Sequence, residues 1–74
     1  MTKDEKIQML TGARAALIDL DTERFFRFVT LTSKQAAELM KFAGYGITTG
    51  GELWCIKGGY RYVFADKNLA AIAE

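Results

Sequence analysis

The sequence has no histidine, no proline and a single cysteine, Cys55, among its 74 residues. Without histidine and with one thiol, the chain has no Ser–His–Asp triad, no Cys–His pair, no zinc cluster and no internal disulfide. Cys55 stands in a strand-like apolar run, which predicts a buried and unreactive thiol. We therefore expect no cofactor and no metal.

An excess of one charge sign and long apolar runs are also lacking. Ten Lys/Arg against nine Asp/Glu leave a formal net charge of +1, so the chain is neither a nucleic-acid mimic nor a polyanion-binding tail. No run approaches the ~20 apolar residues of a membrane span. The opening MTKDEK is polar and acidic, unlike the basic start of a signal peptide. These features predict a cytoplasmic protein with no membrane partner.

The acidic residues and the glycines do not indicate catalysis. Acid–base chemistry near neutral pH usually needs a histidine or a carboxylate with a raised pKa. Asp19 and Asp21 form the closest acidic pair outside the first helical turn, and we expect them to be exposed capping groups at a helix end. Residues 44–51 (GYGITTGG) lack the Gly-Lys-Ser/Thr ending of a phosphate loop, and we interpret them as a connection. We predict that the chain is not an enzyme.

Half of the residues are apolar, which suffices for one small core, so we expect residues 1–74 to form a single domain. The first element has a capping box at Thr2 and Glu5, followed by apolar residues at helical spacing. This pattern predicts a helix that ends near residues 19–21. Gly12 lies inside it and should weaken it by about 1 kcal/mol relative to alanine.

Residues 22–31 (TERFFRFVTL) fit two patterns. Their aromatic and β-branched content favours a strand, whereas a helical reading also aligns the apolar side chains. A second capping box, at Thr32 and Gln35, predicts a helix that ends at Gly44 or Gly46. The apolar positions of that helix are Ala36, Ala37, Leu39, Met40 and Ala43.

The clearest pattern is a β-hairpin, in which residues 52–57 and 60–64 flank Gly58-Gly59. A two-residue turn sets the register. The expected pairs are Lys57 with Tyr60, Ile56 with Arg61, Cys55 with Tyr62, Trp54 with Val63 and Leu53 with Phe64. Asp66 then caps a last short helix. The predicted fold is α+β, in the order α-β-α-β-β-α, with an antiparallel sheet built on the 52–64 hairpin and packed against helices. If residues 22–31 are helical, the order becomes α-α-α-β-β-α, a winged-helix-like layout.

Both faces of this hairpin are apolar, unlike those of a half-solvated ribbon. One face has Leu53, Cys55, Tyr60, Tyr62 and Phe64, which suffice to pack on helices. The other has Trp54, Ile56, Val63 and Arg61, and a chain of this length has little left to cover it. Because tryptophan and arginine are enriched at interface hot spots, we predict that these four residues bind a protein.

Nucleic-acid binding is the alternative, because residues 22–64 have a local charge excess of lysine and arginine. In the winged-helix layout its contacts are Lys34, Lys41, Lys57 and Arg61. Residues 31–40 resemble the first helix of small excisionase-type DNA-binding domains, and residues 57–69 resemble their wing and closing helix. The segment between them has no recognition helix, so the family is not assigned.

The sequence thus predicts a small non-enzymatic protein-binding module, which acts as an accessory or inhibitor protein. The conclusion depends on elimination and on the doubly apolar hairpin. The identity of the partner is not encoded in any motif, and a homodimer is among the options. The alternative is a small winged-helix-like nucleic-acid-binding protein or regulator.

Overall fold

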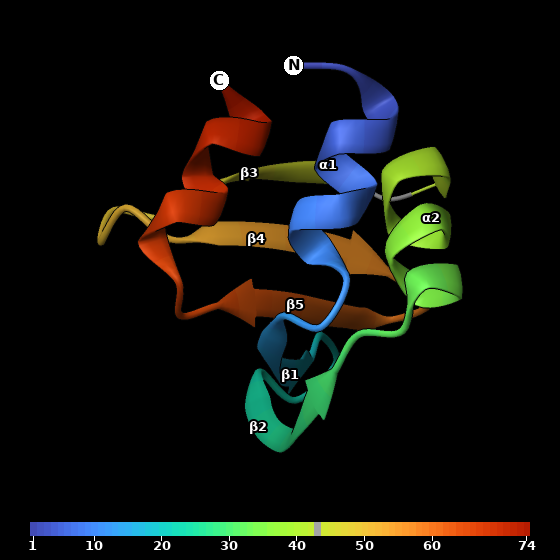
Figure 1. Ribbon diagram of the computed structural model, residues 1–74. Coiled ribbons are helices and arrows are strands. Elements are labelled where there is room, and N and C mark those ends of the chain that lie inside the picture. The colour runs from blue at the N-terminus through green and yellow to red at the C-terminus, as the bar shows by residue number, and fades with distance from the viewer. Residues whose placement is uncertain (43) are drawn as a thin grey trace.

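The computed structural model describes residues 1–42 and 44–74, Phe42 by its backbone only, and in this part of the chain a layer of three helices packs on a five-stranded sheet (Figure 1). The elements in chain order are α1 (Lys3–Leu10), β1 (Arg14–Asp19), β2 (Arg24–Thr30), α2 (Ser33–Phe42), β3 (Gly44–Ile47), β4 (Leu53–Lys57), β5 (Tyr60–Phe64) and the 3-10 helix η1 (Lys67–Ala73). All strand pairs are antiparallel, in the order β2-β1-β5-β4-β3. The predicted α+β class is confirmed.

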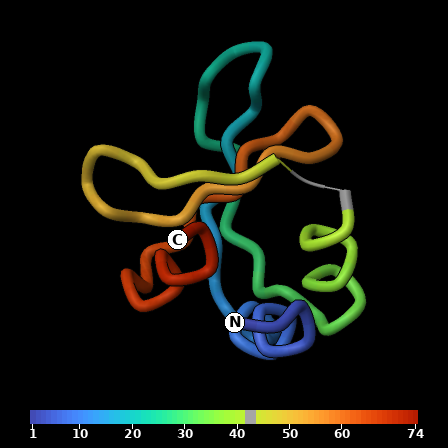
Figure 2. Tube along the Cα trace, turned by 90° about the horizontal axis from the view of Figure 1, so that it is seen from above, coloured from blue at the N-terminus to red at the C-terminus, as the bar shows by residue number. Residues whose placement is uncertain are grey.

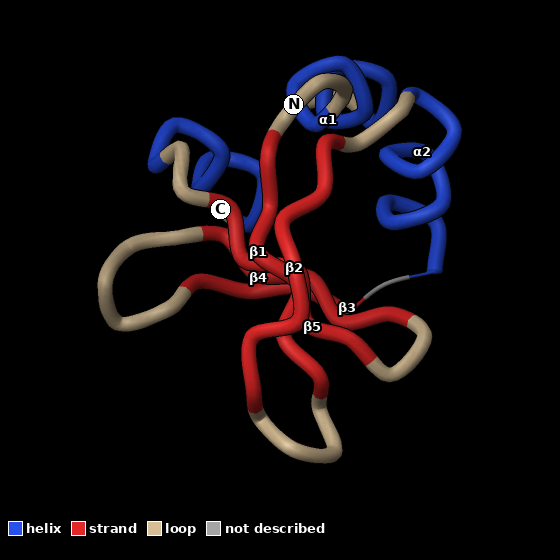
Figure 3. Tube along the Cα trace, turned by 90° about the horizontal axis from the view of Figure 1, so that it is seen from below, coloured by secondary structure: helices blue, strands red, loops and turns tan. Residues whose placement is uncertain are grey.

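The hydrophobic core lies between the helices and one face of the sheet. Figures 2 and 3 show α1, α2 and η1 on the same side of the strands. Burial follows strand alternation, since side chains two apart point to the same face. The buried core cluster comprises Leu10, Ala15, Leu31, Ala36, Leu39, Leu53, Cys55, Phe64, Leu69 and Ile72. These helices therefore cover one face of the sheet only.

The first helix is much shorter than predicted. The capping box of Thr2 and Glu5 is confirmed, with both hydrogen bonds at 3.2 Å. However, α1 ends at Leu10, because Gly12 adopts a φ of 80°, a left-handed conformation that only glycine adopts without strain. Residues 14–19 then form β1, which pairs with both β2 and β5. The predicted helix to residues 19–21 is wrong in its second half.

The predicted acidic helix end is therefore a strand turn. Asp19 ends β1, and its Oδ1 accepts a hydrogen bond of 2.8 Å from the backbone N–H of Asp21. Glu23 closes this turn with a φ of 57° and donates its N–H to the carbonyl of Asp19. The acidic pair thus shapes the β1–β2 turn.

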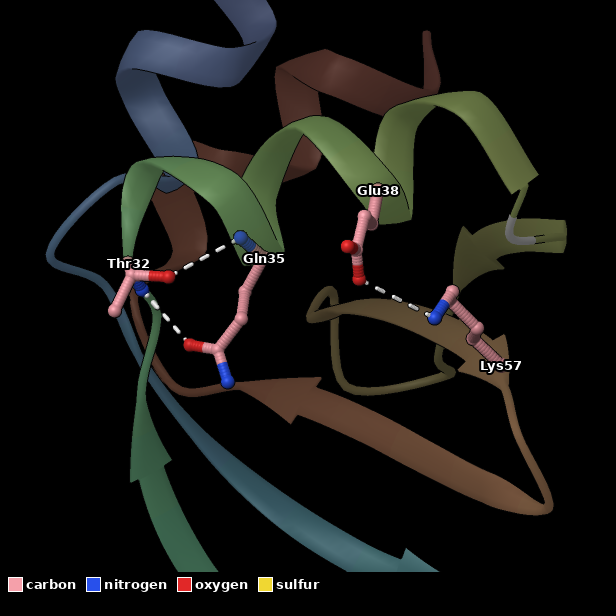
Figure 4. A network of polar contacts seen from close by, with 4 residues as sticks. All are labelled: Thr32, Gln35, Glu38 and Lys57. Carbon is pink, nitrogen blue, oxygen red and sulfur yellow. Dashed lines mark hydrogen bonds and ion pairs between the residues drawn. The ribbon is translucent and has the colours of Figure 1, made fainter.

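Residues 24–30 are a strand, so the winged-helix-like alternative is wrong. This strand pairs with β1 along its length, and its aromatic content favours a strand over a helix. The second capping box is confirmed in α2, where Thr32 and Gln35 exchange hydrogen bonds of 2.9 and 3.2 Å (Figure 4). Ala43, the last apolar position predicted for this helix, lies outside the described residues.

The Gly58-Gly59 hairpin is confirmed in the predicted register, with Lys57 opposite Tyr60 and Trp54 opposite Val63. Asp66 caps η1 by accepting a hydrogen bond from the N–H of Asn68. The glycine-rich segment 44–51 is not a simple connection. Residues 44–47 form β3, which adds a second hairpin to β4. The predicted elements occur in the predicted order, and β1 and β3 are two further strands that the prediction lacked.

Candidate functional site: the uncovered sheet face

The sheet face opposite the helices is the candidate site, and we call it the open face. The printed strand registers place its side chains in rows that cross all five strands. The middle row is Phe28, Ala16, Val63, Trp54 and Gly46, and the row nearer the Gly58-Gly59 turn is Phe25, Ile18, Arg61, Ile56 and Gly44. At the opposite end lie Thr30, Arg14, Ala65, Glu52 and Thr48. No helix of the described residues covers this face (Figures 1 and 3).

The structure brings the four predicted protein-binding residues together on the open face. Trp54 and Val63 are neighbours in the middle row, and Ile56 and Arg61 are neighbours in the next. All four are partly exposed. Their separation from the helix-covered face follows from the confirmed hairpin register, so the sequence was sufficient to place them.

The largest exposed groups of the open face were missed by sequence reasoning. Phe25 and Phe28 on β2 are 54% and 53% exposed, and their ring centroids lie 4.9 Å apart. The guanidinium of Arg14 lies over the Phe28 ring, 4.1 Å from its centroid, in cation–π geometry. Strict alternation over residues 24–30 would place Phe25 and Phe28 on opposite faces, and the bulge at Phe26 puts them on the same face. The bulge had no signal in the sequence, because its partner strand, residues 14–19, was predicted as helix.

The middle row has large aromatic side chains at Phe28 and Trp54 and smaller residues beside them. Phe28 is half exposed on β2, whereas the indole of Trp54 lies close against Gly46 of β3. A Cβ built on Gly46 would lie 2.7 Å from Cζ2 of Trp54, so only glycine allows this approach. Between the two aromatic residues, Ala16 and Val63 form the floor of a hollow of about 410 Å³.

The hollow is open and combines an apolar floor with a charged rim. Arg14 and Glu52 line it together with Phe28 and Ala65. Glu52 is held in place, since its Oε1 accepts a hydrogen bond of 3.3 Å from the Thr48 hydroxyl. The open face therefore presents one cation and one anion at the same end, on either side of the central strand β5.

Phe26 of β2 makes contacts outside the open face. Phe26 is the extra residue of a β-bulge opposite Leu17 and Ile18, and its ring stacks on Tyr60 with centroids 5.6 Å apart. The Arg27 guanidinium lies 5.9 Å from the same ring. A bulge and charged side chains on an edge strand hinder pairing with another chain. Pairing of a further strand along the β2 edge is therefore hindered.

The residues of the nucleic-acid alternative do not form one surface. Lys34 and Lys41 lie on α2, on the helix side of the sheet. Lys57 is on the same side, where its Nζ lies 3.6 Å from Oε2 of Glu38 (Figure 4). Arg61 points to the opposite face of the sheet. The helix and the hairpin of that alternative are present, but its four basic residues are divided between the two faces of the sheet.

The thiol of Cys55 lies in the core. Cys55 is fully buried as predicted, and burial raises the pKa of its thiol to about 11. A protonated thiol is a poor nucleophile and metal ligand. The described residues hold no group of three or more Cys, Asp or Glu side chains placed to bind a metal. None of their helices is long and apolar enough to cross a membrane.

Comparison of the chain with protein-family models, with curated proteins and with solved structures finds no match. A proposal about function therefore has to come from the open face itself.

Proposed function

We propose that this chain is a small non-enzymatic protein-binding module, an accessory or inhibitor protein, that binds its partner through the open face. The observation that supports this most directly is the exposure of Phe25 and Phe28, each more than half exposed on a sheet face without a helix layer. Large contiguous apolar patches on small proteins mark interaction sites. A cytoplasmic location is part of the same proposal.

The composition of the open face also supports protein binding. Trp54, Phe25 and Phe28 are aromatic, and Arg14 and Arg61 are the cations among them. Aromatic residues and arginine are enriched at the centre of protein interfaces, and lysine is depleted there. The open face has arginines but no lysine.

Photo-crosslinking tests the proposal in cells that express the chain. Phe28 is replaced by a photoreactive benzoylphenylalanine, and the matched control carries the same residue at Gln8, an exposed position of α1. We expect a protein adduct from position 28 and none from position 8. If neither position gives an adduct while circular dichroism shows an intact fold, the proposal is wrong. An adduct to nucleic acid at position 28 would favour the alternative function.

A further inference from the structure

We propose that the occupant of the open face is a second copy of this chain, packed sheet on sheet about a two-fold axis that runs along β5. This inference rests on the proposed function, since it names the partner of the same face. In a two-fold interface, each contact between two different residues occurs twice. The rows of the open face can therefore be tested for self-complementarity, strand against strand.

An axis along β5 exchanges the two halves of the sheet. The strand order is β2-β1-β5-β4-β3, so β1 faces β4 of the second copy and β2 faces β3. Such an axis maps a right-handed twist onto itself, so two copies of the same twisted sheet stay parallel. Aligned packing of this kind is the arrangement of β-sandwiches.

The middle row is complementary in shape under this axis. The exposed ring of Phe28 faces Gly46 of the second copy, against which the indole of Trp54 lies. Ala16 faces Trp54 of the second copy, and Val63 meets Val63 of the second copy on the axis. In the next row, Phe25 faces Gly44 and Ile18 faces Ile56. Each of the two exposed phenylalanines thus meets a glycine of the second copy, on both sides of the axis.

The charges of the open face are complementary under the same axis. Arg14 on β1 faces Glu52 at the start of β4, and the symmetry makes two such ion pairs. Within the described part of the single chain Arg14 has no ion pair, and its guanidinium lies on Phe28 instead. Arg61 is the exception, because β5 lies on the axis and brings Arg61 close to its own counterpart.

The size of the face predicts a weak dimer. Five strands about 4.8 Å apart and three rows of side chains about 7 Å apart give a footprint of roughly 24 Å by 21 Å for each copy. The two copies together then bury on the order of 1,000 Å² of surface, at the lower end of protein interfaces. We expect the dissociation constant of the dimer to be on the order of micromolar.

Analytical ultracentrifugation of the purified chain tests the inference, over roughly 1 μM to 1 mM to bracket an interface of this size. Arg14→Glu and Glu52→Arg should each weaken the dimer at least about tenfold, because each replaces two ion pairs by two like-charge contacts. The double variant should restore dimerisation to within a few-fold of the wild type. Lys34→Glu on α2 is the matched charge reversal on the helix side and should change nothing.

Arg61 provides a second and independent measurement. Arg61→Gln should tighten the dimer a few-fold, because it removes the repulsion on the axis, whereas a different partner anchored by Arg61 would lose affinity. A chain that stays monomeric up to 1 mM overturns the inference, as does a dimer that ignores the Arg14 and Glu52 reversals or weakens with Arg61→Gln. The photo-crosslink separates the two proposals. An adduct of position 28 with a mass other than that of two chains contradicts the second copy and keeps the protein-binding function.

Discussion

The two faces of one sheet have similar apolar content and opposite exposure. On the covered face Phe64, Leu53 and Cys55 are each 0% exposed, because three helices pack on them. On the open face, two strands away from Phe64, Phe28 is 53% exposed. Strand propensity alone does not distinguish these phenylalanines. The difference shows that one helix layer buries one apolar face of the sheet, and that the described helices leave the second apolar face exposed to solvent.

The largest expected effect comes from truncating one phenylalanine on each face. Phe64→Ala should lower the free energy of unfolding by about 3–5 kcal/mol, because it leaves a cavity in the core. Phe28→Ala should lower it by less than about 1 kcal/mol, because the ring is already half in water. Urea unfolding at low micromolar protein concentration measures both. Similar losses for the two variants would show that the open face is part of the core.

The buried thiol of the covered face adds a pH dependence. Burial holds the pKa of Cys55 at about 11, above the value of 9.0 of a free thiol. The folded state thus keeps the proton longer than the unfolded state, and stability should fall as the pH rises from about 9 to about 11. Two pKa units correspond to at most about 3 kcal/mol. The loss is measured as the wild type minus Cys55→Ala, which removes contributions from lysine and tyrosine. Equal slopes for the two proteins would contradict this prediction.

The hairpin of β4 and β5 was predictable, because the residues that determine it are close together in the sequence. Two glycines between apolar runs set the turn, the turn sets the register, and the register assigns Trp54 and Val63 to one face. Both capping boxes are local in the same sense, since each closes within four residues.

The remaining strands depend on contacts far apart in sequence. The run of residues 14–19 suits a helix by composition, and it becomes a strand because β2 and β5 pair with it on both sides. The only local sign that the helix ends at Leu10 was Thr11-Gly12, and we interpreted Gly12 as a glycine tolerated within the helix. Similarly, β3 is rich in glycine and gains its strand partner from β4 and its packing from Trp54. Half of the open face was missed for this reason.

A substitution at Gly12 tests the boundary between α1 and β1. Gly12→Ala should cost about 1 kcal/mol, because a side chain at a φ of 80° is strained although space is free. Gly44→Ala on the open face is the matched control, since it also has free space and no left-handed φ, and should cost less. Thermal unfolding of both variants measures the difference. A harmless Gly12→Ala would mean that the chain continues past Leu10 as a helix.

The smallest expected effect is at the rim of the covered face, where Glu38 of α2 and Lys57 of β4 form an ion pair of 3.6 Å (Figure 4). Both side chains are about one-third or more exposed, so solvent screens their attraction. A double-mutant cycle of Glu38→Gln and Lys57→Met should give a coupling of at most about 0.5 kcal/mol, which declines further in high salt. A coupling of about 2 kcal/mol would show that charge contributes as much as burial to holding α2 on the sheet. In that case the contrast between the two faces would no longer rest on the helix layer's apolar contacts alone.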